Sequence, residues 1–96
     1  MATFIILANF TDQGIKAVKD SPERFNTVRG LAEKVGATIK SVYWTVGRYD
    51  VLTVVEGTDE AVTSMLLKLG SLGNVRTETM RAFSAEDFKK LVGKMP

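Results

Sequence analysis

The residues of this chain that could do chemistry gather around one predicted β-turn, Gly47-Arg48-Tyr49-Asp50, between two β-rich runs over residues 38–46 and 51–56. A glycine at the first central position of a two-residue turn supplies the positive φ of a type II′ turn. Tyr49 and Asp50 then put a phenol and a carboxylate where the chain re-enters the sheet. A carboxylate can act as a general base, and a phenol can donate a hydrogen bond to a developing anion.

Strand alternation adds further polar side chains to this candidate site. With a two-residue turn, Thr45 lies opposite Asp50, and both share a sheet face with Tyr43. Tyr49 falls on the other face, together with Val46. A cleft at this end of the sheet could also collect polar residues of the first and last strands. The candidate ligand-binding residues are Asn9, Tyr43, Thr45, Tyr49, Asp50, Arg76 and Glu78.

Each of these residues also has a structural interpretation, which we prefer. Asp50 can cap backbone amides of the hairpin, as aspartate often does in turns. Tyr49 and Trp44 can pack at the rim of the sheet or anchor an interface. Arg76 and Glu78 can form an exposed cross-strand pair or a salt bridge between subunits. The sequence alone leaves open whether Asp50 is a turn cap or a functional carboxylate.

Composition narrows the possible chemistry. The 96 residues include no cysteine and no histidine, which removes thiolate nucleophiles, sulfur metal ligands and the commonest general base near neutral pH. We therefore expect no metal site and no cofactor, and any base has to be a carboxylate whose pKa is raised by burial. The formal net charge of +2 is too small to indicate nucleic acid or an anionic membrane as a partner.

No segment predicts membrane insertion or export. The N-terminus lacks a basic region followed by a cleavable apolar segment, and no apolar run approaches the length of a membrane span. A chain without cysteine also suits a reducing compartment. We therefore expect a cytoplasmic protein.

The elements that must position these residues follow from apolar periodicity. Residues 3–10 are almost continuously apolar and predict a strand buried on both faces. Ser21-Pro22-Glu23 predicts a helix start with Ser21 as the N-cap, and Gly36 is the expected helix end. Gly30, inside this helix, is expected to mark a close approach between the helix and the sheet.

The second half of the chain repeats the alternation of helix and strand. Thr58-Asp59-Glu60 begins a second helix, and residues 75–83 predict the fourth strand. Ser84, with Asp87 three residues later, resembles a capping box and opens a short terminal helix. The residues of this helix that we expect to face inward are Phe88, Leu91 and Val92.

The resulting order, β-α-β-β-α-β with a helix appended, is that of the α+β ferredoxin-like fold. Right-handed crossovers place both main helices on one face of an antiparallel four-stranded sheet of order 4-1-3-2, in a single domain over residues 1–96. The other face should be polar in a monomer, yet the first strand is apolar on both parities, and Leu52 and Val54 add to it. A second copy is the simplest cover, so we expect a homodimer or larger homo-oligomer.

Taken as a whole, the sequence resembles the GYD-domain proteins, small bacterial proteins named for a Gly-Tyr-Asp signature. The similarity rests on Thr11-x-x-Gly14, Pro22-x-Arg24, the Gly36 helix end, Tyr43, Gly47-x-Tyr49-Asp50, and Val75-Arg76-Thr77-Glu78-Thr79 followed by Ala82-Phe83. The resemblance implies a ferredoxin-like fold of the dimeric α+β-barrel kind and no particular reaction. Some proteins of the wider barrel group are cofactor-free monooxygenases, isomerases or ligand-sensing modules, which is an analogy of fold.

Two classes of function remain. The preferred one is a homo-oligomeric domain that binds a small molecule or acts as a scaffold. The alternative is a cofactor-free enzyme, a monooxygenase or isomerase, with Asp50 as the base and with a donor to an enolate or phenolate among Tyr43, Tyr49 and Asn9. An enclosed pocket containing Asp50 or Glu78 would favour the enzyme, whereas a large apolar sheet–sheet interface would favour the oligomeric domain.

Overall fold

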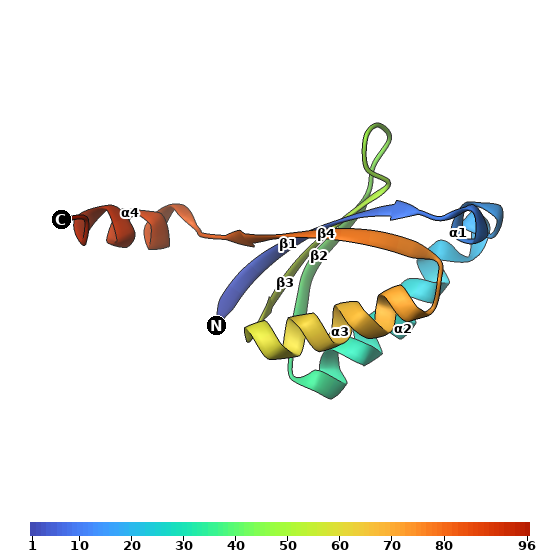
Figure 1. Cartoon of the computed structure of the whole chain (residues 1–96), viewed down its shortest axis with the longest axis horizontal. Helices are drawn as coiled ribbons and strands as arrows, with labels where there is room; N and C mark the ends of the chain where they lie inside the picture. Colours follow the sequence, from blue (N-terminus) through green and yellow to red (C-terminus); the bar gives the residue numbers. More distant parts are fainter.

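The computed structural model describes residues 1–96, which form a four-stranded antiparallel sheet with two long helices on one face (Figure 1). The strands are β1 (Ala2–Phe10), β2 (Thr38–Trp44), β3 (Val51–Gly57) and β4 (Val75–Ala82). The helices are α1 (Asp12–Lys16), the 3-10 turn η1 (Val18–Asp20), α2 (Ser21–Val35), α3 (Asp59–Ser71) and α4 (Ala85–Gly93). The sheet order β2-β3-β1-β4 is the predicted order read from the other edge, so the ferredoxin-like α+β fold is confirmed. No helix is long and apolar enough to cross a lipid bilayer.

Most helix ends use the signals predicted from the sequence. The hydroxyls of Thr58 and Ser84 accept hydrogen bonds from backbone amides three residues later, at 3.1 and 3.0 Å, and so begin α3 and α4. Gly36 ends α2 with a left-handed φ of 81°. The prediction of Ser21 as an N-cap is wrong, because Asp20 holds that position and Ser21 is the first residue of α2.

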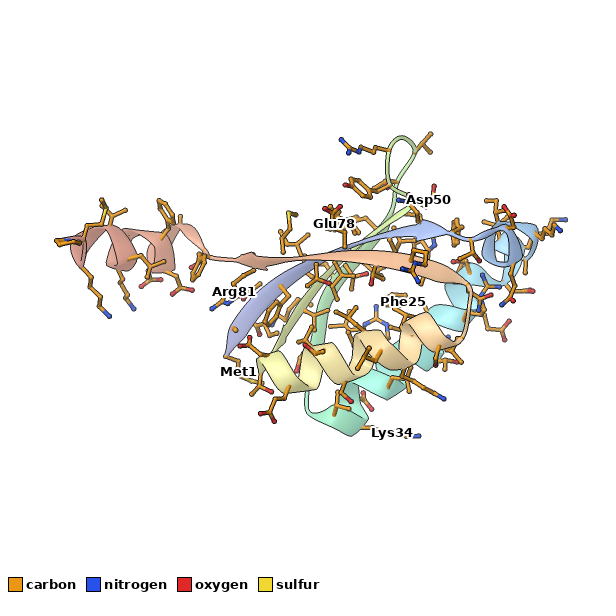
Figure 2. All side chains as sticks on the ribbon, viewed as in Figure 1. Met1, Phe25, Lys34, Asp50, Glu78 and Arg81 are labelled. Carbon is orange, nitrogen blue, oxygen red and sulfur yellow. The ribbon has the colours of Figure 1, made fainter.

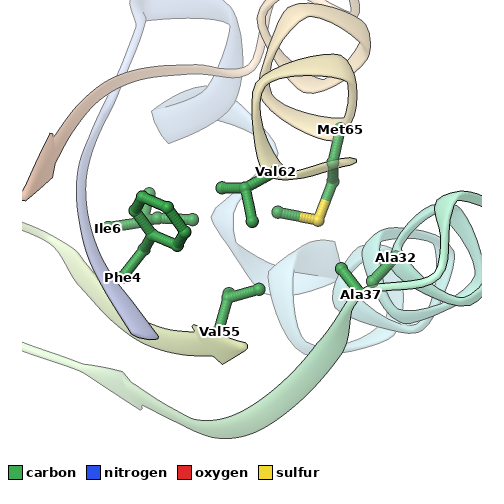
Figure 3. Close-up of a cluster of buried hydrophobic side chains, with 7 residues drawn as sticks. All are labelled: Phe4, Ile6, Ala32, Ala37, Val55, Val62 and Met65. Atoms are coloured by element: carbon green, nitrogen blue, oxygen red, sulfur yellow. The ribbon is translucent and has the colours of Figure 1, made fainter. Parts of the chain in front are cut away.

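The hydrophobic core lies between the sheet and helices α2 and α3 (Figure 3). Alternate residues of β1 and β3 point into it, in agreement with the period of two along a strand. Within the chain only this face of β1 is covered, and Ile5 and Leu7 on the other face are half-buried, so the predicted burial of both faces is not met by the single chain. The buried apolar side chains of the core are Phe4, Ile6, Ala32, Ala37, Val55, Val62 and Met65.

The close backbone approach predicted at Gly30 occurs instead at Gly14. A methyl group added at Gly30 would meet no atom within 4 Å, so that prediction is wrong. The same methyl at Gly14, in α1, would stand 1.9 Å from the carbonyl oxygen of Asn74. Thr11 holds the two segments together, because its N–H donates to the Asn74 carbonyl at 3.0 Å and its hydroxyl donates to the Gly73 carbonyl at 2.6 Å. Helix α1 is therefore tied to the loop that leads into β4.

Helix α4 projects away from the rest of the molecule (Figure 1). The radius of gyration is 14.5 Å, compared with about 12.5 Å for a compact chain of this length. The apolar side chains predicted to face inward, Phe88, Leu91 and Val92, are 58%, 43% and 51% exposed. That prediction is wrong for the single chain, because β4 carries α4 beyond the helical layer, where no other element can cover it.

The β2–β3 hairpin has a bulge at its start and an irregular tip. Pairing shifts between Ile39 and Ser41, which leaves Lys40 in a bulge of the edge strand β2. At the other end, the Thr45 N–H donates to the Asp50 carbonyl at 2.8 Å, as the predicted register requires. Gly47 has the predicted positive φ, at 148°. This angle is far from the roughly +60° of a type II′ turn, so the predicted turn type is wrong.

Candidate functional site

The sheet face opposite α2 and α3, called the open face below, carries an apolar patch drawn from all four strands. The strand registers align Tyr43, Leu52, Leu7 and Glu78 in one row across the sheet, and Ser41, Val54, Ile5 and Met80 in the next. The inner side chains of these rows are half-buried, and those at the two edges are exposed except for Ser41. The open-face patch consists of Ile5, Leu7, Tyr43, Leu52, Val54 and Met80.

The structure links Thr45, Tyr49 and Glu78 through Tyr49 and pairs Asn9 with Arg76, but it does not bring all seven candidate residues together. The Tyr49 hydroxyl donates to Glu78 Oε2 at 2.6 Å, and Asn9 and Arg76 are cross-strand partners on β1 and β4. The Thr45 hydroxyl donates to the Tyr49 carbonyl at 2.5 Å within the hairpin. Tyr43 lies on the edge strand β2, with β3 and β1 between it and Glu78 on β4. The predicted set therefore spans the open face and its hairpin tip instead of one cleft.

The sheet face predicted for Tyr49 from the hairpin register is wrong. Tyr49 was expected to lie with Val46 on the face opposite Asp50, but its hydroxyl reaches Glu78, which belongs to the open face. This is possible because regular pairing of β3 begins at Val51, so the residues of the tip do not keep strict alternation. Figure 2 shows Asp50 and Glu78 on the side of the sheet away from the helices.

The environment of Tyr49 keeps its phenol protonated. The hydrogen bond to Glu78 raises the pKa of Tyr49 above its ordinary value of 10.0, and partial desolvation and the negative charge of Glu78 raise it further. The charge of Arg48, whose guanidinium carbon lies 5.8 Å from the centre of the ring, acts in the opposite direction. At neutral pH this side chain is therefore a hydrogen-bond donor and not a base.

Asp50 completes the pairing of β1 with β3. Its N–H donates to the Ala8 carbonyl at 2.9 Å, one residue beyond the last aligned pair, Ala8 and Val51. The next amide of β1 that points this way, the Phe10 N–H, donates to Asp50 Oδ2 at 2.8 Å. The carboxylate thus takes the position that a strand carbonyl would have, which is a backbone-capping contact of the kind aspartate makes in turns.

A cavity of about 270 Å³, called the helix–sheet cavity below, opens on the opposite side of the sheet, between the strands and helices α2 and α3. Ten of its 15 lining residues are hydrophobic, and Arg24 is the one residue of the lining that carries a charge. None of the seven candidate residues lines it. The lining includes the aromatic residues Phe10, Phe25 and Trp44 and the polar residues Arg24, Thr53 and Asn74.

Trp44 forms part of the cavity wall and is held there by α2. Its Nε1 donates to Ser21 Oγ at 3.0 Å, so the buried Ser21 hydroxyl contacts Trp44 from the first residue of α2. The Trp44 ring meets Phe25 edge to face, with ring centres 5.9 Å apart and an interplanar angle of 70°. Figure 2 locates Phe25 on the helix-covered side of the sheet.

The cavity residues Ser21, Arg24, Phe25 and Thr53 were not predicted as site residues from the sequence. An apolar stripe at helical spacing is typical of core packing, and nothing in such a stripe shows where the packing leaves space. The signal available in the sequence was Arg24, directly before Phe25 in the first turns of α2. No group of three or more acidic side chains is arranged to hold a metal ion.

Comparison with known proteins supports the similarity seen in the motifs. The family model of the GYD domain matches residues 4–92. The chain belongs to the GYD domain family. A relative from Thermus thermophilus, named glutamine synthetase and cystathionine beta-lyase binding protein, is 37% identical over 89 residues. The aligned region covers 91% of this GYD-domain chain and 94% of the relative.

Solved structures share the fold at lower identity. The crystal structure of FFRP-DM1 has a TM-score of 0.61 at 22% identity and covers 86% of this chain and 100% of its own. The hypothetical protein PHS023 from Pyrococcus horikoshii has the same TM-score and identity, with coverage of 88% and 92%. The protein TTHA0845 from Thermus thermophilus has a TM-score of 0.54 at 24% identity, with coverage of 88% and 96%. At this level of identity the three structures show a shared fold and carry no information about function.

Proposed function

We propose that this GYD-domain protein is a homo-oligomeric binding module, in which two copies pair through their open faces and the assembly holds other proteins. The observation that carries the proposal is the open-face patch. Half-buried Leu7 and Leu52 at its centre, with exposed Tyr43 and Met80 at its edges, are covered by no element of the chain. Contiguous apolar surface of this kind is typical of interaction sites, and a second copy offers the same patch in a self-complementary arrangement.

Helix α4 supports the same proposal. Its first turn carries Glu86 and Asp87, and lysines follow on the same polar side, so this side of the helix is suited to contact with water. The opposite side presents Phe88, Leu91 and Val92 to solvent. Because the helix projects from the body of its own chain, the surface that can cover this side belongs to another molecule. We propose that α4 packs on a second copy.

Protein partners are supported by the relative from Thermus thermophilus, whose name describes binding to two enzymes. We extend to this chain the general role of binding proteins, without transferring those two partners. The enzyme alternative has less support, because the Asp50 carboxylate is engaged by the Phe10 amide and neither Asp50 nor Glu78 lines the helix–sheet cavity.

Sedimentation equilibrium at micromolar concentration tests the proposed pairing. The parent protein should be a dimer or a larger assembly, and a monomer of 10.5 kDa would contradict the proposal. Leu52→Lys places a charge in the centre of the open-face patch without touching the core, and should weaken self-association at least tenfold because an unpaired charge is costly to bury. Leu67→Lys is the matched control, because Leu67 is 71% exposed on α3, outside the patch, and its substitution should leave the assembly unchanged.

A further inference from the structure

We infer that the helix–sheet cavity is a binding site for a small aromatic carboxylate, that is, a single ring bearing a carboxylate on a short side chain. The inference goes beyond the proposed protein-binding role and does not depend on it, since the cavity lies on the sheet face opposite the open-face patch. It rests on the volume of the cavity, its aromatic wall, a guanidinium without a carboxylate partner and a buried hydroxyl that bonds to no other residue.

The volume sets the size of the ligand. A protein cavity of about 150 Å³ lined by apolar side chains holds benzene. The helix–sheet cavity, at about 270 Å³, therefore has space for a ring and a substituent of a few atoms. Pockets for drug-sized molecules begin at roughly 300 Å³, so fused-ring or larger ligands do not fit without movement of α2 or α3.

The wall of the cavity favours a planar apolar group. Phe10, Phe25 and Trp44 all line it, and aromatic rings pack well against another ring, edge to face or with an offset. Trp44 is fixed in orientation by its hydrogen bond to Ser21 and its contact with Phe25. The wall is therefore arranged before a ligand arrives, which lowers the entropic cost of binding.

The charge of the lining favours an anion. Arg24 is half-buried, and one of its nitrogens donates to the Ala17 carbonyl at 2.8 Å, which anchors the guanidinium beside the cavity. The one ion pair of the chain joins Lys40 and Glu56, so Arg24 has no carboxylate partner of its own. A guanidinium has five N–H donors in a planar fork that matches a carboxylate. No aspartate or glutamate lines the cavity, so a cationic ligand has no counter-charge there.

Thr53 gives the cavity a second polar contact. It lies on β3 between Val42 and Ile6, in the middle of the helix-covered face, and is only 7% exposed. Its hydroxyl makes no hydrogen bond to another residue. Every fully buried polar side-chain atom of the protein has a hydrogen-bond partner, so the Thr53 hydroxyl is not fully buried. Because Thr53 lines the cavity, we take the hydroxyl to be accessible from the cavity. Among the other polar lining residues, Ser21 and Asn74 already accept hydrogen bonds from Trp44 and Gln13.

The fluorescence of Trp44 provides a direct test, because the chain contains one tryptophan and it lines the cavity. Phenylacetate should change the emission of the assembled parent protein in a saturable manner, with a dissociation constant of about 1 mM or tighter. 2-Phenylethylamine has a similar ring and chain with a positive charge, and should bind at least tenfold more weakly. This comparison needs no substitution. Equal affinity for the two compounds, or no saturable change with phenylacetate, would overturn the inference.

Two variants assign the contacts. Arg24→Gln should weaken phenylacetate binding at least tenfold. Arg29→Gln is the control, since Arg29 lies on the same helix, over the Phe25 ring, and does not line the cavity. Thr53→Val removes the hydroxyl at nearly constant volume and should weaken binding a few-fold.

A competing occupant of the cavity is α4 of a second copy. In that case phenylacetate will bind only after residues 85–96 are removed, and this result would contradict the inference. Sedimentation of the parent and the shortened protein shows whether removal of residues 85–96 also abolishes self-association.

Discussion

Gly14→Ala should destabilise this GYD-domain protein strongly, although the residue lies in a helix of only five residues. The added methyl carbon would stand 1.9 Å from the Asn74 carbonyl oxygen and 2.9 Å from the carbonyl carbon. Both atoms are backbone, so no side chain can rotate away. The two segments have to separate by about 1 Å before the contact becomes acceptable.

That separation strains the hydrogen bonds that Thr11 makes across the same contact, at 3.0 Å to the Asn74 carbonyl and 2.6 Å to the Gly73 carbonyl. Overpacking costs about 1–3 kcal/mol, and weakening one of these hydrogen bonds adds about 1 kcal/mol. The higher helix propensity of alanine increases the free energy of unfolding by about 1 kcal/mol and offsets part of this loss. We expect a net loss of about 2 kcal/mol, or a decrease in Tm of roughly 10 °C for a domain of this size.

Urea unfolding followed by circular dichroism, at one fixed protein concentration, measures this loss. Gly30→Ala is the matched control, because alanine at Gly30 meets nothing within 4 Å and should stabilise α2 by about 0.5–1 kcal/mol. The two substitutions add the same methyl group to a helical glycine and should shift the urea midpoint in opposite directions. A Gly14→Ala protein within about 0.5 kcal/mol of the parent would refute the reasoning from the close approach.

Three further predictions concern the hairpin tip. Gly47→Ala should lower the free energy of unfolding by about 1 kcal/mol, since a side chain is strained at the φ of 148°; an unchanged urea midpoint would show that the loop relaxes freely. Asp50→Ala should cost about 1–3 kcal/mol because the Phe10 amide loses its acceptor, whereas Asp50→Asn keeps a carbonyl and should cost no more than about 1 kcal/mol; equal losses would contradict the capping contact. The raised pKa of Tyr49 means that its hydrogen bond to Glu78 contributes to stability below about pH 10 and is lost as the pH rises through the raised pKa. In a Tyr43→Phe background, which leaves one tyrosine, the absorbance titration should move to lower pH after Glu78→Gln, and a fixed midpoint would count against the pair.

The sheet order was predictable because each element carries local signals that agree with one another. Thr58 and Ser84 start helices, Gly36 ends one, and the handedness of crossovers then leaves one arrangement of four strands. The orientation of α4 was not predictable in the same way. Its pattern shows that Phe88 lies on an apolar side, but a pattern within one chain does not show whether that side is covered by the same chain or by another.

The candidate site was harder to predict than the fold. Asn9 could be selected from the sequence because it is polar on the apolar strand β1, and Arg76 because it shares one parity of β4 with Glu78. The helix–sheet cavity is built instead from residues such as Phe25 that have the periodicity of an ordinary core. Whether such residues pack against one another or leave a space depends on how far the start of α2 lies from the sheet. The hydrogen bond that joins the two there is made by Trp44 and Ser21, which come from different parts of the chain.

The bulge at Lys40 has a consequence for how copies of this sheet can meet. Strands β2 and β4 are the sheet edges, and edge strands expose backbone groups to which a foreign strand can add. The bulge interrupts β2 and places a lysine there, while β4 carries the exposed charges of Arg76, Glu78 and Arg81. Both edges thus resist strand addition, the step by which a sheet grows into a fibril. The proposed self-association would therefore use the sheet face and α4 instead of the sheet edges.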